Sequence, residues 1–137
     1  MINSVNALEQ DVAINGNVVF TTDRVRTRAC GCGGWLDYET GGSVFTIARP
    51  GIYKVDFNAN VTLDAAGDAI LAIESNGEAV AGTEMDATIA AAGDFENISA
   101  STLIVVQCGS SRSISIGNLS ATAVTVDDAN IIITRIA

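Results

Sequence analysis

The sequence contains no histidine, and only 17% of its 137 residues are charged. Histidine is the commonest general base and a frequent metal ligand near neutral pH, so its absence removes the usual acid–base and metal sites. The sequence also lacks a Gly-x-Ser-x-Gly nucleophile motif, a phosphate-binding loop and a Cys-x-x-Cys pair. We therefore expect no catalytic residue, no cofactor, no metal site and no enzymatic activity. The one enzyme class left open is a glycan hydrolase that uses only two carboxylates.

Basic residues are scarce as well, with one lysine, Lys54, and a net charge of −9. Nucleic-acid binding needs a basic surface that displaces phosphate counterions, so we expect no nucleic-acid partner. The charged share lies below the usual value of about 25%. A small monomer normally covers its surface with charge, so this deficit indicates that other subunits cover part of the surface.

Long apolar runs are also absent. No stretch is long enough to span a membrane, so we expect no membrane partner. The first ten residues have neither the basic region nor the apolar region of a signal peptide. We expect a protein that is made in a cytosol and either stays there or leaves by assembly or lysis.

Strand-forming residues dominate what is present, and proline occurs only at Pro50. The clearest strand is residues 52–61, where Tyr53, Val55 and Phe57 alternate with polar residues. This period of two directs one side of the strand into a core and the other into water. The sequence therefore predicts an all-β sandwich.

Asn-Gly pairs at 15–16 and 76–77 are typical of hairpin turns. The residues predicted as strands are 12–14, 18–21, 44–47, 52–61, 69–74, 78–81, 98–107, 113–116, 123–126 and 130–136. We expect these to be about ten antiparallel strands. The alanine-rich residues 85–93 are expected to form a loop, and residues 1–10 a flexible N-terminal arm before a single domain, 11–137.

Two predicted strands are apolar on both faces, at residues 103–106 and 131–133. One face of a sandwich strand is normally wet, so the second face needs cover, either from another element or from a neighbouring subunit. Because no helix is expected, we favour a subunit interface for the C-terminal strand. The candidate residues of this subunit interface are Ile131, Ile133, Leu103 and Val105.

Arg24, Arg26 and Arg28 alternate along a predicted strand and would share one face. One interpretation is a stripe that binds carboxylates of a neighbouring subunit or a partner protein. The other is a solvated edge strand whose charge prevents aggregation. Trp35 lies among glycines and either contacts a partner or caps the sandwich.

The three cysteines are Cys30, Cys32 and Cys108. Their spacing allows a bridge from Cys108 to Cys30 or Cys32, a bridge between subunits, or reduced thiols. A metal site is not expected, because zinc sites usually have four ligands and the sequence has no histidine to complete the set.

The order of strands and turns resembles the tumour-necrosis-factor-like jelly roll shared with complement globular heads. The resemblance covers roughly residues 11–137, and its landmarks are residues 45–47, 51–57, 73–78 and 130–134. It is strongest to a bacterial and phage branch that includes exosporium glycoprotein heads and small virion proteins. The resemblance implies a jelly-roll sandwich that forms a homotrimer, with the C-terminal strand near the threefold axis.

What the resemblance implies for function is a phage virion protein that decorates or cements a capsid, or caps a head fibre. Its partners would be its own copies and the major capsid protein or another virion protein, and its location would be the virion surface. The alternative is an adhesion or receptor-binding head, on a phage fibre tip or a spore surface, that recognises a glycan or a host protein.

Overall fold

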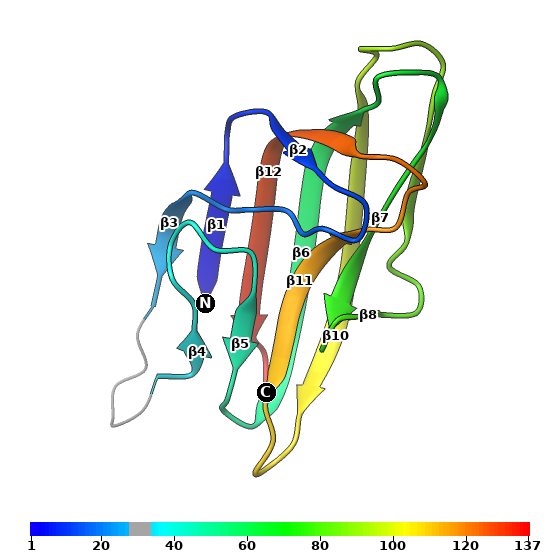
Figure 1. Ribbon diagram of the computed structural model, residues 1–137. Helices are drawn as coiled ribbons and strands as arrows, with labels where there is room; N and C mark the ends of the chain where they lie inside the picture. Colours follow the sequence, from blue (N-terminus) through cyan, green and yellow to red (C-terminus); the bar gives the residue numbers. More distant parts are fainter. Residues whose placement is uncertain (28–33) are drawn as a thin grey trace.

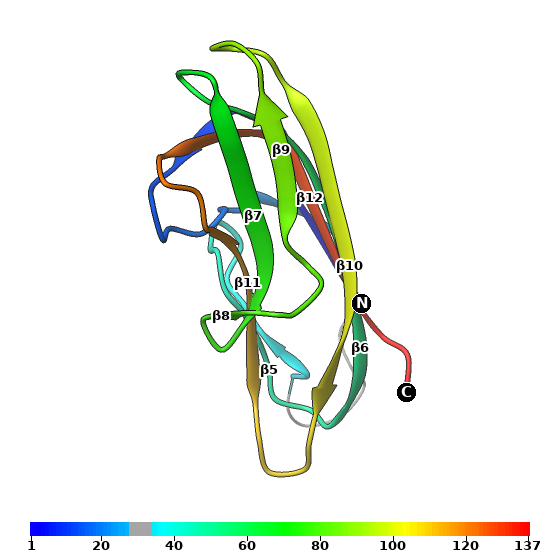
Figure 2. The ribbon, with the colours of Figure 1, turned by 90° about the vertical axis from the view of Figure 1, so that its right-hand side faces the viewer.

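The computed structural model describes residues 1–27 and 34–137, which form two packed antiparallel sheets (Figure 1). In sheet I the order is β10 (Glu96–Val106), β6 (Gly51–Thr62), β12 (Val124–Arg135), β1 (Ile2–Asn6) and β3 (Thr22–Arg26), with β2 (Gln10–Val12) beside β12. In sheet II the order is β4 (Leu36–Asp37), β5 (Phe45–Ile47), β11 (Arg112–Asn118), β7 (Gly67–Ser75) and β8 (Glu78–Ala79), with β9 (Met85–Ile89) beside β7. Figure 2 shows the two layers from the side. The all-β jelly-roll sandwich is confirmed, with twelve strands in the described part of the chain.

The alternation predicted for residues 52–61 is present in β6. The side chains of Tyr53, Val55 and Val61 are fully buried between the sheets, and Lys54 on the opposite face is exposed. Each large apolar side chain buried in this way contributes about 1.5–3 kcal/mol. The strand therefore forms the centre of the core from sheet I.

Both Asn-Gly segments form turns, but only the second one joins two paired strands as predicted. Asn76 and Gly77 have positive φ angles of 53° and 80°, as a two-residue hairpin turn requires, and they join β7 to β8. Asn15 also has a positive φ angle, of 59°. The segment that follows does not pair with β2, since the backbone N–H of Val18 donates to the carbonyl of Ile116 on β11. The chain thus crosses from sheet I to sheet II here.

The expectation of a loop at residues 85–93 is wrong for its first half. Residues Met85–Ile89 form β9, which pairs with β7. Met85, Ala87 and Ile89 are buried, whereas Asp86 and Thr88 are exposed. Small alanine side chains hide this period of two in the sequence, because alanine is common in loops, helices and strands alike.

The N-terminal residues are part of the sandwich and do not form a separate arm. Strand β1 lies between β12 and β3, with Ile2 opposite Ile133 and opposite Arg26. The Ile2 side chain is fully buried. The expected boundary between residues 1–10 and 11–137 is therefore wrong, since the domain begins with its first strand.

Residues 123–126 and 130–136, predicted as two strands, are one long strand, β12, with a bulge. Its register against β6 shifts between Asp127 and Asn130, and Asp128 has a positive φ angle of 50°. A bulge inserts residues that have no direct partner and bends the strand. The bulge sets which side chains after it face the core.

Candidate interaction surfaces

The outer face of sheet I carries exposed aliphatic side chains. Leu103 and Val105 of β10 have exposed fractions of 56% and 55%, and Ile136 after β12 has 54%. Val105 lies opposite Ile52, whose carbonyl accepts the backbone N–H of Ile136. Residues opposite each other in a sheet present their side chains on the same face. These aliphatic side chains, which we call the sheet I patch, therefore lie together at one end of the sheet.

The prediction that Ile131 and Ile133 form a subunit interface is wrong. Both side chains are fully buried inside the protomer, where they pack between the two sheets. The outward positions of this part of β12 are Asn130, Ile132 and Thr134, which are half-buried. A doubly apolar strand has one face for its own core and one for the outside, and Ile132 is on the outside.

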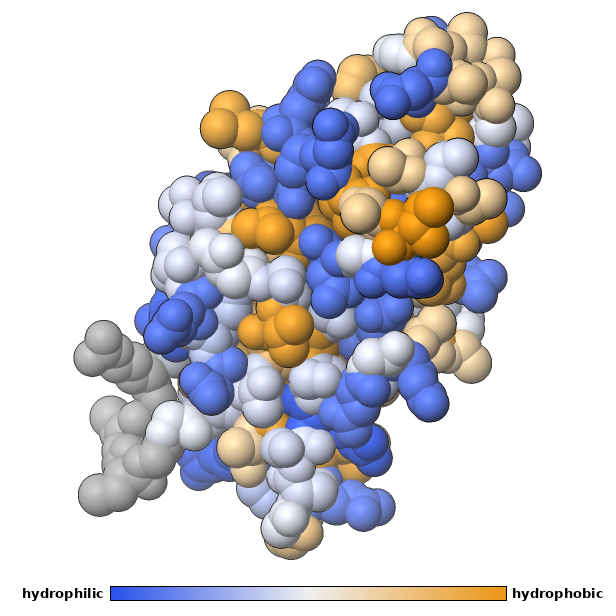
Figure 3. Space-filling view, in the orientation of Figure 1, coloured by the Kyte–Doolittle hydropathy of each residue, from blue (hydrophilic) through white to orange (hydrophobic). Residues whose placement is uncertain are grey.

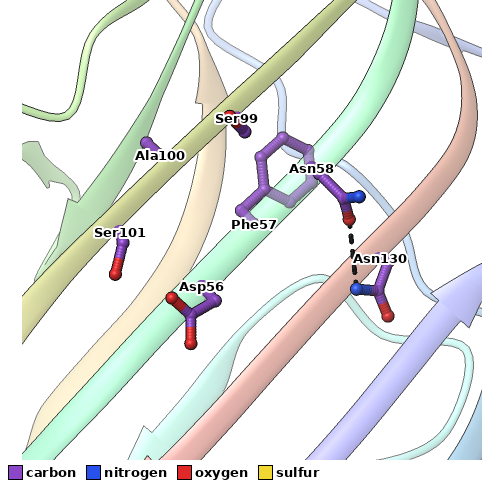
Figure 4. Close-up of a pocket in the computed structure, with 7 residues that line it drawn as sticks. All are labelled: Asp56, Phe57, Asn58, Ser99, Ala100, Ser101 and Asn130. Atoms are coloured by element: carbon purple, nitrogen blue, oxygen red, sulfur yellow. Dashed lines mark hydrogen bonds between the residues drawn. The ribbon is translucent and has the colours of Figure 1, made fainter.

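Polar side chains follow the sheet I patch along the same face. A shallow hollow of about 500 Å³ is lined by Asp56, Phe57, Asn58, Ser99, Ala100, Ser101 and Asn130. Figure 4 shows the amide of Asn130 on β12 donating to Asn58 Oδ1 on β6, at 3.1 Å. The Asn3 amide of β1 donates in turn to Asn130 Oδ1. Asp56 pairs with Lys54 at 3.1 Å. These groups are suited to hydrogen bonding, and none is a nucleophile activated by a base.

The predicted arginine stripe is only partly available to a partner. Arg26 donates from Nη2 to the carbonyl of Tyr38 at 2.9 Å, lies 3.6 Å from Asp23 and stands 5.9 Å over the Tyr38 ring. Arg24 is exposed, and it lies at a bulge where the register of β3 against β1 shifts. Arg28 lies outside the described residues. The guanidinium of Arg26 thus holds β3 to the β4–β5 connection.

Trp35 was a candidate partner contact, and the structure makes it a core residue. Its exposed fraction is 7%. Its ring stacks on Tyr53 with centroids 5.7 Å apart, and Nε1 donates to the carbonyl of Thr27 at 3.0 Å. An indole that is buried with its N–H bonded has little left to offer a partner. Trp35 therefore caps the sandwich.

The outer face of sheet II is chemically different. Figure 3 shows hydrophobic residues there as separate spots among hydrophilic ones. Buried Ser115 donates to the carboxylate of Glu74 at 3.2 Å on this face. A mixed surface of this kind is ordinary for a face in contact with water.

Cys108 is exposed in the β10–β11 turn. Cys30 and Cys32 lie outside the described residues, so the predicted pairing stays a prediction. Among the residues that the structure describes, no group of three or more acidic or cysteine side chains is arranged to hold a metal ion. The same part of the chain has no helix of the length and hydropathy that a membrane span requires.

Comparisons with known proteins identify the fold. The structure is similar to the globular domain of zebrafish complement 1qA protein, with a TM-score of 0.69 at 13% identity over 99% of this chain and 96% of that one. It is similar to Eiger TNF from S. frugiperda, with a TM-score of 0.68 at 9% identity over 99% and 92% of the two chains. It is also similar to the PRD1 vertex protein P5, with a TM-score of 0.50 at 14% identity over 99% and 96%.

No protein-family model and no curated protein matches the sequence. The structural likeness extends over nearly the whole chain in each case, from β1 to the end of β12. At these identities the likeness concerns the fold. The chain therefore has the tumour-necrosis-factor-like jelly-roll fold, which complement globular domains, TNF ligands and a phage vertex protein share.

Proposed function

We propose that three copies of this chain assemble into a non-enzymatic head domain of a phage virion, bound to the capsid or to a head fibre. The observation that carries the proposal is the sheet I patch of Leu103, Val105 and Ile136. The fold that the chain shares with a phage vertex protein supports the virion setting. A sequence without histidine supports a binding role over a catalytic one.

The energetic argument for self-association is the cost of leaving the sheet I patch in water. Burying apolar surface stabilises a complex by about 25 cal/mol per Å². Association opposes this gain through the lost freedom of each subunit, so the contact must extend beyond three side chains. The half-buried residues of the same face, Ile52 and Ile132, and the polar hollow beside them supply that area.

On a virion the mechanism would be thermodynamic linkage. A protein that binds the assembled shell, and not free shell subunits, stabilises the shell in proportion to the logarithm of its concentration over its Kd. A trimer matches the local threefold positions of an icosahedral lattice. Three linked contacts would also bind far more tightly than one.

Replacing Val105 with aspartate tests the self-association. The variant would put a carboxylate into a contact that excludes water, which costs several kcal/mol, and we expect it to sediment as a single chain of 14.1 kDa. The matched control is Ile14→Asp, because Ile14 is equally exposed at 53% but lies in the turn after β2. A trimer that survives Val105→Asp and dissociates with Ile14→Asp would refute this interface.

Attachment to the virion is tested by co-sedimentation. We expect the purified chain to pellet with phage heads that lack it, with saturation at a fixed number of trimers per head, and to bind host cells weakly. Saturable binding to host cells or to a glycan array, without binding to heads, would contradict the structural role and favour an adhesion head.

A further inference from the structure

Three of the arginines lie at one end of the sandwich, and eight of the 16 acidic residues lie at the other. One end contains the β5–β6 turn, the β10–β11 turn and the end of β12, which lie together at the bottom of Figure 1. Arg49, Arg112 and Arg135 lie there, and we call it the arginine end. The acidic residues of the opposite end are Glu9, Asp11, Asp64, Asp68, Asp94, Glu96, Asp127 and Asp128. None of the basic residues that the structure describes lies at that acidic end.

Backbone contacts hold the three arginines of the arginine end in one corner. Arg135 donates from Nη2 to the carbonyl of Pro50 at 3.0 Å, directly after Arg49. Arg112 lies opposite Ile47, two residues before Arg49. Burial raises the pKa of the Tyr53 phenol, and the positive charges of Arg135 and Arg49 partly counter that rise. The Tyr53 hydroxyl donates to the Arg49 carbonyl at 2.8 Å, and Arg135 lies opposite Tyr53 in the sheet, so the two arginines lie on either side of this residue.

Among the residues that the structure describes, these three arginines form no ion pair with an acidic side chain. The ion pairs among the described residues join Arg26 to Asp23 and Lys54 to Asp56. Arg49 and Arg135 are exposed, and Arg112 is half-buried. Like charges that lie close together repel unless an anion offsets them, and a guanidinium binds a carboxylate through two parallel hydrogen bonds.

We propose that the arginine end is the surface that attaches the molecule to a carboxylate-rich protein surface. The inference rests on the proposed function in one respect, which is the number of contacts. A cyclic trimer presents three copies of each arginine at the same level along its threefold axis, so one trimer can contact the partner surface three times. The acidic end would then project away from the partner. Such a contact combines charge complementarity with the enrichment of arginine that is typical of protein interfaces.

A phosphate polymer such as a nucleic acid fits this end less well. The chain as a whole carries a net charge of −9. A continuous line of phosphates would be repelled by this net negative charge, whereas separate carboxylates on a folded partner can contact the arginines alone.

The test measures binding of the full chain to immobilised poly-L-glutamate at low and high salt. We expect wild type to bind at low salt and to be released at high salt, because exposed charges are screened. Arg49→Glu should weaken binding about tenfold, and Arg49→Glu with Arg112→Glu more, since each lost charged hydrogen bond is worth about 1.5 kcal/mol or more. Arg24→Glu is the matched control, because it makes the same charge change on exposed β3, two strands from β12. We expect its binding to stay within about twofold of wild type.

Equal losses in Arg49→Glu and Arg24→Glu would overturn the proposal, because binding would then follow net charge. Binding to double-stranded DNA as tight as binding to poly-L-glutamate would overturn the choice of partner. The Arg49 side chain has no hydrogen bond or ion pair in the described structure, so the variant should unfold at the wild-type temperature. Sedimentation of the same samples separates the two proposals. A trimeric Arg49→Glu that no longer binds supports both, whereas a monomeric wild type that binds through Arg49 refutes only the trimer.

Discussion

The indole of Trp35 is held from two sides. Its N–H donates to the Thr27 carbonyl, and its ring lies on Tyr53. Its role is therefore to close the end of the core between β3 and β4, which is one of the two roles that the sequence left open. The sequence could not decide between them, because glycine indicates a turn in the backbone and carries no information on where the next side chain points.

Trp35→Phe should lower the free energy of unfolding by about 1–3 kcal/mol, because the hydrogen bond and part of the stacked area are lost. Urea unfolding followed by circular dichroism measures this change. The sedimentation of the variant should match wild type. An unchanged unfolding free energy would mean that Trp35 does not support the core.

The phenol of Tyr53 gives the fold a dependence on high pH. Burial raises its pKa above the ordinary value of 10.0, with partial compensation from Arg135 and Arg49. As the pH rises, the phenol loses its proton in the unfolded chain before it does so in the folded protein. The contribution of the protonated phenol to folding stability is therefore complete below pH 10, and it is lost as the pH rises through the higher pKa of the folded state. We expect the unfolding temperature to fall less steeply above about pH 10 in Tyr53→Phe than in wild type. Parallel pH profiles of the two proteins would contradict this origin.

At the scale of elements, β1 is the strand whose contribution is most directly testable. Ile2→Ala should destabilise the fold by about 2–5 kcal/mol, since it opens a cavity in the core under β1, beside Ile133 of β12. Leu8→Ala is the control, because Leu8 is 74% exposed between β1 and β2, and its effect should stay within about 0.5 kcal/mol. Urea midpoints measure both. Equal effects of the two changes would return residues 1–10 to the flexible arm that the sequence suggests.

The buried face of a strand can be recognised in the sequence only when its side chains are clearly apolar. In β6 the large side chains of Tyr53 and Phe57 alternate with Lys54 and Asn58, so the buried face is evident. In β1 the buried face includes Ser4 and Asn6, which are satisfied by hydrogen bonds to Asp23 and to the Val19 carbonyl. Buried polar residues of this kind look like solvent-facing ones until their partners are known.

In the C-terminal strand, the sequence does not reveal which face meets the core. The run Ile131–Ile132–Ile133 indicates that both faces are apolar, but not which face meets the core. The bulge at Asp128 decides that, and no residue in the run reveals it. Leu103 and Val105 were predicted as trimer-interface residues and are exposed, whereas Ile136, with the same outward period as Ile132 and Thr134, was not among the candidates.

At the scale of the whole molecule, the charge asymmetry depends on topology. Arg49, Arg112 and Arg135 are far apart in the sequence and meet only because three strands begin or end at the same end of the sandwich. The stripe around Arg24 was visible in the sequence because its members are neighbours. Contacts between distant segments follow from the order of strands in the sheets, which only the fold supplies.

The proposed trimer requires that other copies of the chain cover the sheet I patch. Sedimentation equilibrium of wild type at micromolar concentration measures this most directly. We predict one species with about three times the 14.1 kDa mass of a single chain, unchanged on dilution within the micromolar range. A folded species of 14.1 kDa under the same conditions would refute the trimer.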